Sequence, residues 1–142
     1  MIRFKLTLQL ALIAFALAPA IPLPAEERMR AGLWELTTTV NGKPSGLARN
    51  TCFTPAMVEL TNSPAKTLRE ATQKAATKGG YCSLKDYKMD GNAISMTIVC
   101  GARSSATSST YSANVFDTVN TSTEAGVTTV SHIKGRFLGP CK

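Results

Sequence analysis

Four cysteines are the residues of this 142-residue chain most able to form covalent bonds. They are Cys52, Cys82, Cys100 and Cys141. No two of them are spaced as CxxC, so the sequence does not indicate a thioredoxin-like redox site. The short ligand knuckles of a zinc site are missing as well. In an exported protein, an even number of cysteines at such spacings predicts two structural disulfides.

Four cysteines allow three pairings. The residues around the turn 90–92 read as a β-hairpin whose register places Cys82 opposite Cys100, so a direct bond between these two is possible. An up-and-down sheet would instead bring all four cysteines to one end, where Cys52–Cys82 and Cys100–Cys141 could form. We favour this second pairing, because each bond would close a long loop and stabilise the fold by roughly 3 to 4 kcal/mol.

Acid–base catalysis has two candidate residues, Asp86 and His132. His132 is the single histidine, and it follows Ser131 on a predicted strand, where adjacent side chains point to opposite faces and cannot form a dyad. Asp86 falls on the apolar face of the hairpin, opposite Met96, where a buried carboxylate could act as an acid or a base. It could equally lie at the sheet edge beside Lys88. We therefore assign no catalytic residue, metal ligand or cofactor-binding residue.

Apolar side chains on several predicted strands share one face of the sheet. They are Trp34, Leu36, Leu84, Met96 and Ile98. In one interpretation they form a solid core with Trp34 as its largest member. In the other they form the wall of a ligand cavity, which a small antiparallel barrel or strongly curved sheet can enclose.

The elements that would position these residues are mostly strands. Alternation of apolar and polar residues predicts strands at 32–40, 47–53, both arms of the hairpin, 111–116 and 127–134. Thr54-Pro55 and Ser63-Pro64 read as helix starts and predict an inserted helical segment on the sheet rim. The fold class is therefore mainly β (α+β): about six antiparallel strands in a curved sheet or partly open barrel, with two disulfides at one end. The Ser/Thr/Ala-rich stretch 102–110 begins a strand or forms a loop.

The beginning of the chain predicts its compartment. Two basic residues precede the apolar stretch 6–17, and small residues follow it, as in a secretory signal peptide. Cleavage after Ala20 or Ala25 would leave a signal peptide, 1–25, and one disulfide-stapled domain, 26–142. The apolar stretch is too short to span a membrane, and no span is predicted in the mature chain. We expect a periplasmic or secreted protein.

The charge of the chain restricts its partners. Lys and Arg number 16 against 9 Asp and Glu, and the predicted leader contains two of the basic residues. The remaining basic residues are scattered, with few aromatic residues among them, which argues against nucleic acid. The partner itself stays unknown. The charge fits an anionic envelope component but favours simply a soluble surface, a small apolar ligand is the other candidate, and no cofactor is expected.

Several short motifs recur in an order that resembles a known family. They are GLWELT at 32–37, CFTP at 52–55, Cys82, CG at 100–101 and GRFLGPC at 135–141. Together they resemble the bacterial domain of unknown function 3617 family over essentially the whole mature chain. The family usually has proline where this sequence has Ala31. The resemblance implies an exported, periplasmic protein without established activity, supplies no catalytic residue, and supports reading the four cysteines as one structural set.

The leading functional hypothesis is a non-enzymatic binding or envelope-accessory protein. Two alternatives remain open. One is a small enzyme that uses Asp86 or His132 as its acid/base group. The other is a structural or interaction protein that acts through a basic surface and the stretch 102–110.

Overall fold

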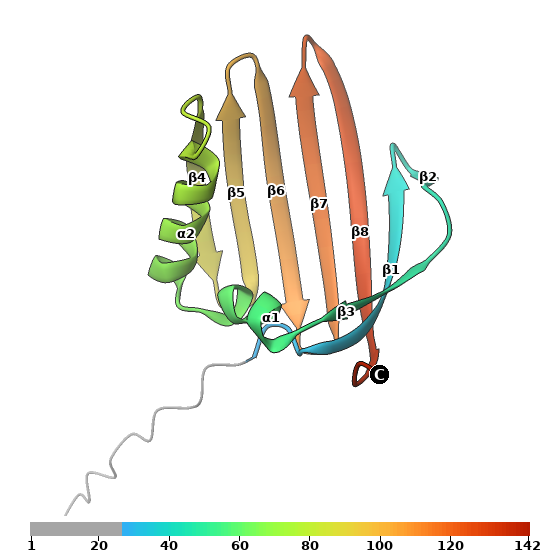
Figure 1. Cartoon of the computed structure of the whole chain (residues 1–142). Helices are drawn as coiled ribbons and strands as arrows, with labels where there is room; N and C mark the ends of the chain where they lie inside the picture. Colours follow the sequence, from blue (N-terminus) through green and yellow to red (C-terminus); the bar gives the residue numbers. More distant parts are fainter. Residues whose placement is uncertain (1–26) are drawn as a thin grey trace, which may run out of the picture.

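Eight strands form one antiparallel sheet in the computed structural model, which describes residues 27–142 (Figure 1). The strands are β1 Gly32–Val40, β2 Lys43–Pro44, β3 Arg49–Phe53, β4 Cys82–Asp90, β5 Ala93–Cys100, β6 Arg103–Ser112, β7 Val115–Glu124 and β8 Val127–Gly139. Their order is β2-β1-β8-β7-β6-β5-β4, and β3 also pairs with β1. Since β4 forms one edge and β2 and β3 the other, the sheet is open. The expected mainly β antiparallel fold is confirmed.

Two helices, α1 Pro55–Asn62 and α2 Ala65–Thr77, connect β3 to β4. The side chain of Thr54 caps α1 by accepting a hydrogen bond from the backbone N–H of Met57, and proline follows in the first turn. α2 buries Leu68 and lies against β4, the edge strand (Figure 1). This arrangement confirms the helical segment predicted on the rim of the sheet. We call the sheet face that carries both helices the inner face and the opposite one the outer face.

The aromatic core lies on the inner face, at the end where β1 begins and β8 ends. Its buried members are Met29, Trp34, Val58 and Phe116. Trp34 is fully buried, and its ring centroid lies 5.4 Å from that of Phe116 and 5.7 Å from that of Phe137. Its Nε1–H donates to the carbonyl of Arg30 at 2.9 Å, which satisfies the one polar atom that the indole takes out of water.

Gly135 allows the core to approach β8. A Cβ at this position would overlap the ring of Phe116, so the ring occupies the space that any larger residue would need. The irregularity in the pairing of β1 with β8 lies between Leu33 and Trp34, and Gly135 serves the packing of the ring.

The Ser/Thr/Ala-rich stretch accounts for part of the difference between about six predicted strands and eight observed ones. Residues 103–112 form β6 and pair along their length with β5 and β7. The predicted strand at 111–116 is wrong, because the turn between β6 and β7 falls at Ala113 and Asn114. Ala113 has a positive φ of 45°, as such a tight turn requires.

The hairpin of β4 and β5 keeps the predicted register only near Cys82 and Cys100, which face each other. Past Lys85 a β-bulge shifts the pairing by one residue, and Asp86 within the bulge has a φ of 49°. Because of this shift, the turn contains two residues, 91–92, rather than the predicted three.

The bulge decides which side chains of β4 reach the inner face. Met89 pairs with Ile94 there, in the place that an unbroken register would have given to Lys88. Tyr87 takes the inner position that was predicted for Asp86. The predicted placement of Asp86 on the apolar face is wrong: it is exposed on the outer face, where its charge stays in water.

The disulfides join Cys52 to Cys141 and Cys82 to Cys100. The favoured pairing, Cys52–Cys82 with Cys100–Cys141, is therefore wrong, and so is the expectation that both bonds lie at one end. The start of β1 pairs with Cys52 on one side and with Gly139 on the other, so the chain end reaches Cys52. The second bond closes the hairpin at the opposite end of the sheet.

No helix within residues 27–142 is long and apolar enough to cross a membrane. The predicted signal peptide, 1–25, lies outside the described residues.

Candidate binding groove beside helix α2

The five residues predicted as a cavity wall fall into two separate groups. Trp34 has no exposed surface, and Leu36 packs against the core around it. Leu84, Met96 and Ile98 lie on β4 and β5, and three strands, β6 to β8, separate them from β1. The structure therefore does not bring the five residues around one space.

His132 lies on the outer face. Its Nε2 is 2.5 Å from Oδ1 of Asp117, and the other carboxylate oxygen is 3.7 Å from Nζ of Lys134. Ser131 points to the inner face, so the two residues lie on opposite faces, as strand alternation predicted. Asp86 is also on the outer face, but β5, β6 and β7 separate it from His132. Among the described residues, no three His, Cys, Asp or Glu side chains gather as metal ligands.

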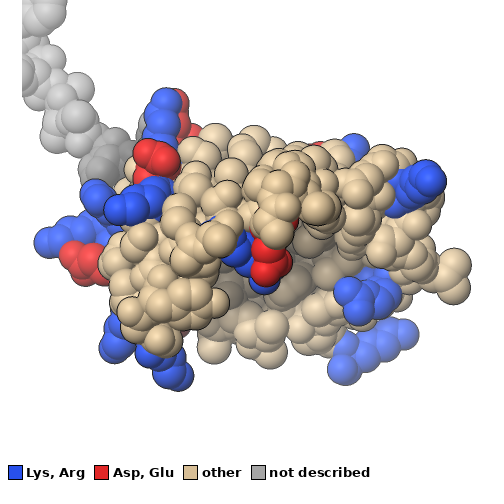
Figure 2. Space-filling model, turned by 90° about the horizontal axis from the view of Figure 1, so that it is seen from above, with Lys and Arg blue, Asp and Glu red and all other residues tan. Residues whose placement is uncertain are grey.

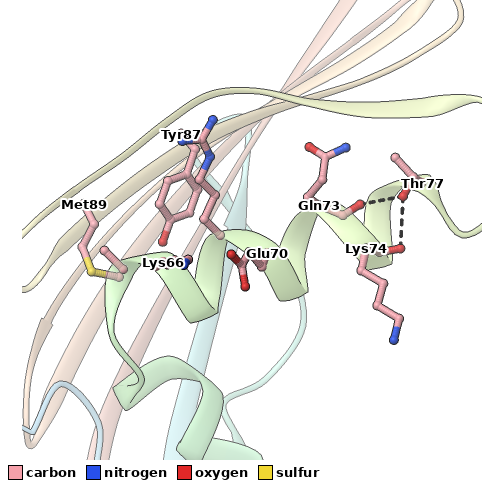
Figure 3. A pocket seen from close by; sticks show the side chains of 9 residues that line it. Lys66, Glu70, Gln73, Lys74, Thr77, Tyr87 and Met89 are labelled. Carbon is pink, nitrogen blue, oxygen red and sulfur yellow. Dashed lines mark hydrogen bonds between the residues drawn. The ribbon is translucent and has the colours of Figure 1, made fainter.

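A groove of about 820 Å³ runs between α2 and the edge strand β4 (Figure 3). Its volume is in the range of small-molecule sites in proteins. The side chains that define its chemistry are Lys66, Arg69, Glu70, Lys74, Tyr87 and Met89. They come from one side of the helix and from the part of β4 that follows the bulge.

Helical spacing places the basic residues of α2 along the groove. Lys66, Glu70 and Lys74 recur every four residues, near one helical turn, and Arg69 follows Lys66 by three. Leu68, on the neighbouring side, is buried and anchors α2 to the sheet. Three cations against one carboxylate give the groove a net positive charge, and their aliphatic stems add apolar surface.

The floor of the groove contains an unpaired hydroxyl group. The ring of Tyr87 points from β4 toward α2 (Figure 3). Its Oη is shielded from solvent and has no hydrogen-bond partner within residues 27–142. Burial raises the pKa of the Tyr87 phenol above its ordinary value of 10.0, and the charges of Arg28 and Arg69 act in the opposite direction. At neutral pH this phenol is a neutral donor that lacks an acceptor.

Arg28 and Arg69 have different roles at this hydroxyl. Nε of Arg28 donates to the carbonyl of Gly91 at 3.1 Å, and Nη1 donates to those of Thr61 and Ser63 at 3.0 Å. This guanidinium therefore joins the β4–β5 turn to the α1–α2 junction. The guanidinium of Arg69 is exposed and makes no hydrogen bond or ion pair within the described chain, so it can meet a ligand.

Sequence reasoning identified neither Tyr87 nor the basic side of α2 as a site. The alternation of β4 placed Tyr87 on the polar face, and only the bulge turns it inward. A positive φ at an aspartate leaves no pattern in a single sequence that could have revealed this shift. The groove itself suits a ligand that combines an anionic group with an apolar body.

Comparison with known proteins agrees with the motifs. The family model for DUF3617, a protein of unknown function, matches residues 29–141, which include both disulfides and the groove. No curated protein and no solved structure matches the chain. Two disulfides are typical of an extracytoplasmic protein. The chain therefore belongs to the DUF3617 family, whose function is unknown.

Proposed function

We propose that the protein is a non-enzymatic, exported binding protein that holds a small anionic amphipath in the groove between α2 and β4. The observation that carries this proposal is the shielded hydroxyl of Tyr87, a donor without an acceptor in the groove that the exposed Arg69 also lines. The two partners expected from the sequence, a small apolar ligand and an anionic component, are then two parts of one molecule.

The anionic part is argued from the cost of the unpaired hydroxyl. A shielded polar group without a partner costs about 1 to 3 kcal/mol. An oxygen of a carboxylate or phosphate group would accept from Tyr87, and the positive charge of Arg69, which lines the same groove, would favour such an anion. A cationic ligand would meet three positive side chains, and a neutral one would leave Arg69 without a counter-charge.

The apolar part is argued from the lining. Met89 and Ala65 supply apolar atoms, and the aliphatic stems of Lys66 and Lys74 extend that surface along the helix. The groove is open to solvent, so the body of a ligand can lie along α2 while its anionic end reaches Tyr87.

The enzyme alternative depends on Asp86 or His132. Both lie on the outer face, and the groove is on the inner face. The proposal therefore gives neither residue a role in binding, and substitution of either should leave ligand affinity unchanged.

Calorimetric titration of the mature protein tests the proposal. We expect dodecanoate to bind saturably, and two ligands with the same chain, neutral dodecyl maltoside and cationic dodecyltrimethylammonium, to bind at least tenfold more weakly. Tyr87→Phe keeps the ring and removes one hydrogen bond to a charged group, which is worth about 1.5 to 3 kcal/mol, so affinity should fall by about ten- to a hundredfold. Arg69→Gln should also weaken binding.

Arg103→Gln is the matched control, because Arg103 is an exposed arginine outside the groove and should not affect dodecanoate. Equal affinity for all three head groups would refute the proposal. So would unchanged affinity in Tyr87→Phe.

A further inference from the structure

A second set of polar side chains lies on the inner face, away from the groove. Six side chains of β6, β7 and β8 face one another in two rows, and we call them the hydroxyl patch. They are Ser105, Ser122 and Thr129 in one row and Thr107, Asn120 and Ser131 in the other. All six are half-buried. In Figure 1 these strands lie side by side, and α2 covers β4 instead of them. The Ser/Thr-rich stretch of the sequence thus supplies one side of the patch.

Four residues of the patch, Asn120, Ser122, Thr129 and Ser131, line a hollow of about 390 Å³, and Ser105 and Thr107 lie beside it, hydrogen-bonded to Asn120. Figure 2 looks down on the end of the molecule that carries the β5–β6 and β7–β8 turns, and it shows the inner side hollowed. Arg103 and Glu124 lie at the rim, with Nε and Oε2 4.0 Å apart. Because these two charges oppose each other, the hollow has no net charge.

Asn120 orients the hydroxyl groups beside it. Its Nδ2 donates to Oγ of Ser105 at 2.7 Å and to Oγ1 of Thr107 at 2.8 Å, which uses both amide hydrogens. Ser105 and Thr107 accept these bonds and keep their own O–H groups as donors. Oδ1 of Asn120 has no partner within the described residues. The patch therefore presents donors on both sides of an acceptor.

The outer face of the same strands has a different composition. It carries Asp117, His132 and Lys134 in ion pairs, and Arg136 paired with Glu35 at 3.0 Å. Charged side chains of this kind keep a sheet face solvated. The hydroxyl patch contains none, so its hydrogen-bonding groups are matched to a neutral partner and not to an ion.

We infer that the hydroxyl patch binds a neutral, polyhydroxylated ligand of the saccharide class. Each sugar hydroxyl both donates and accepts, which fits alternating donors and acceptors such as those of Ser105, Thr107 and Asn120. The volume of the hollow accommodates a ligand of one or two sugar rings. The patch shares no residue with the groove beside α2, so this inference does not depend on the proposed function.

Amide NMR spectra recorded during titration test the inference. The probes are glucose, N-acetylglucosamine, trehalose and myo-inositol. We expect at least one of them to shift the amide signals of the patch saturably. Asn120→Ala should lower its affinity about tenfold, and Thr107→Val, which keeps the side-chain shape, about fivefold. Ser108 and Thr121 lie on the outer face of the same strands, so Ser108→Ala and Thr121→Val should leave the affinity unchanged.

Three results would overturn the inference. The first is the absence of localised shifts with all four probes, and the second is an equal effect of Thr107→Val and Ser108→Ala. The third is a set of shifts confined to Arg103 and Glu124. The spectra of the variants also report their folding, and Thr107→Val remains a test if Asn120→Ala does not fold. Dodecanoate should still bind to the Asn120→Ala variant, which separates this inference from the proposed function.

Discussion

The two disulfides should differ in their contribution to stability, because they close loops of very different length. Cys52 and Cys141 are 89 residues apart, and Cys82 and Cys100 are 18 residues apart. The perturbation is the replacement of one bonded pair at a time by alanine, which leaves the other bond in place. Both bonds join segments of one sheet: Cys82 and Cys100 face each other on β4 and β5, and Cys52 on β3 is joined to Cys141, which follows β8.

The magnitude follows from the loop-closure entropy that each bond removes from the unfolded chain. Because the inner bond lies within the outer loop, it already shortens that loop to about 70 residues. In the chain-entropy model, loss of the outer bond then costs about 4.4 kcal/mol and loss of the inner bond about 3.2 kcal/mol. We therefore expect the Cys52→Ala/Cys141→Ala protein to be the less stable of the two, by about 1.2 kcal/mol.

Urea unfolding of the two variants and the wild type, followed by the fluorescence of Trp34, measures both differences. Trp34 is fully buried and is the single tryptophan, so its emission reports the core directly. Peptide mapping of the wild type should recover Cys52 with Cys141 and Cys82 with Cys100. A smaller loss of stability in the outer-bond variant would refute the entropy argument, and any other pairing would refute the geometry.

Two further predictions concern single side chains. Gly135→Ala should lower the free energy of unfolding by about 1 to 3 kcal/mol, because its Cβ would overlap the ring beneath it. In contrast, no atom lies within 4 Å of a Cβ placed at Gly79, so Gly79→Ala should leave the free energy of unfolding unchanged or raise it. An equal loss of stability in both variants, measured by urea unfolding, would contradict this reasoning. The neutral Tyr87 phenol, whose pKa is raised above 10.0 by burial, contributes stability that is present below pH 10 and lost as the pH rises through the folded value. Dodecanoate affinity should therefore be constant from neutral pH to about pH 10 and fall above it. The difference in phenolate absorbance between the wild type and Tyr87→Phe measures the ionisation of Tyr87. Ionisation of Tyr87 below pH 10 would contradict this prediction.

Local patterns in the sequence predicted the parts of this fold that depend on near neighbours. Thr54-Pro55 identified the start of α1, because capping and the fixed φ of proline act within one turn. Alternation placed Trp34 on the core face of β1, where it is fully buried. The predicted hairpin register placed Cys82 opposite Cys100, although the disulfide pairing that we favoured did not join these two residues.

The parts that the sequence did not predict depend on contacts between distant segments. Cys52 meets Cys141 because β3 and β8 both pair with β1, and no local pattern specifies which strands share a neighbour. The stretch 103–112 lacks apolar alternation, so its strand depends on pairing with β5 and β7 on both sides. Neither candidate site has an apolar pattern of its own.

The bulge in β4 connects the stability of the sheet to the candidate groove. An exposed edge strand can pair with another chain, and a bulge together with outward lysines such as Lys85 and Lys88 opposes such pairing. The same bulge turns Tyr87 and Met89 under α2 and gives the groove its unpaired donor and its apolar floor. The extra residue at Asp86 therefore interrupts a regular edge strand and also places the side chains that form the groove. A chain without it would lose both the proposed binding function and the protection against pairing with another chain.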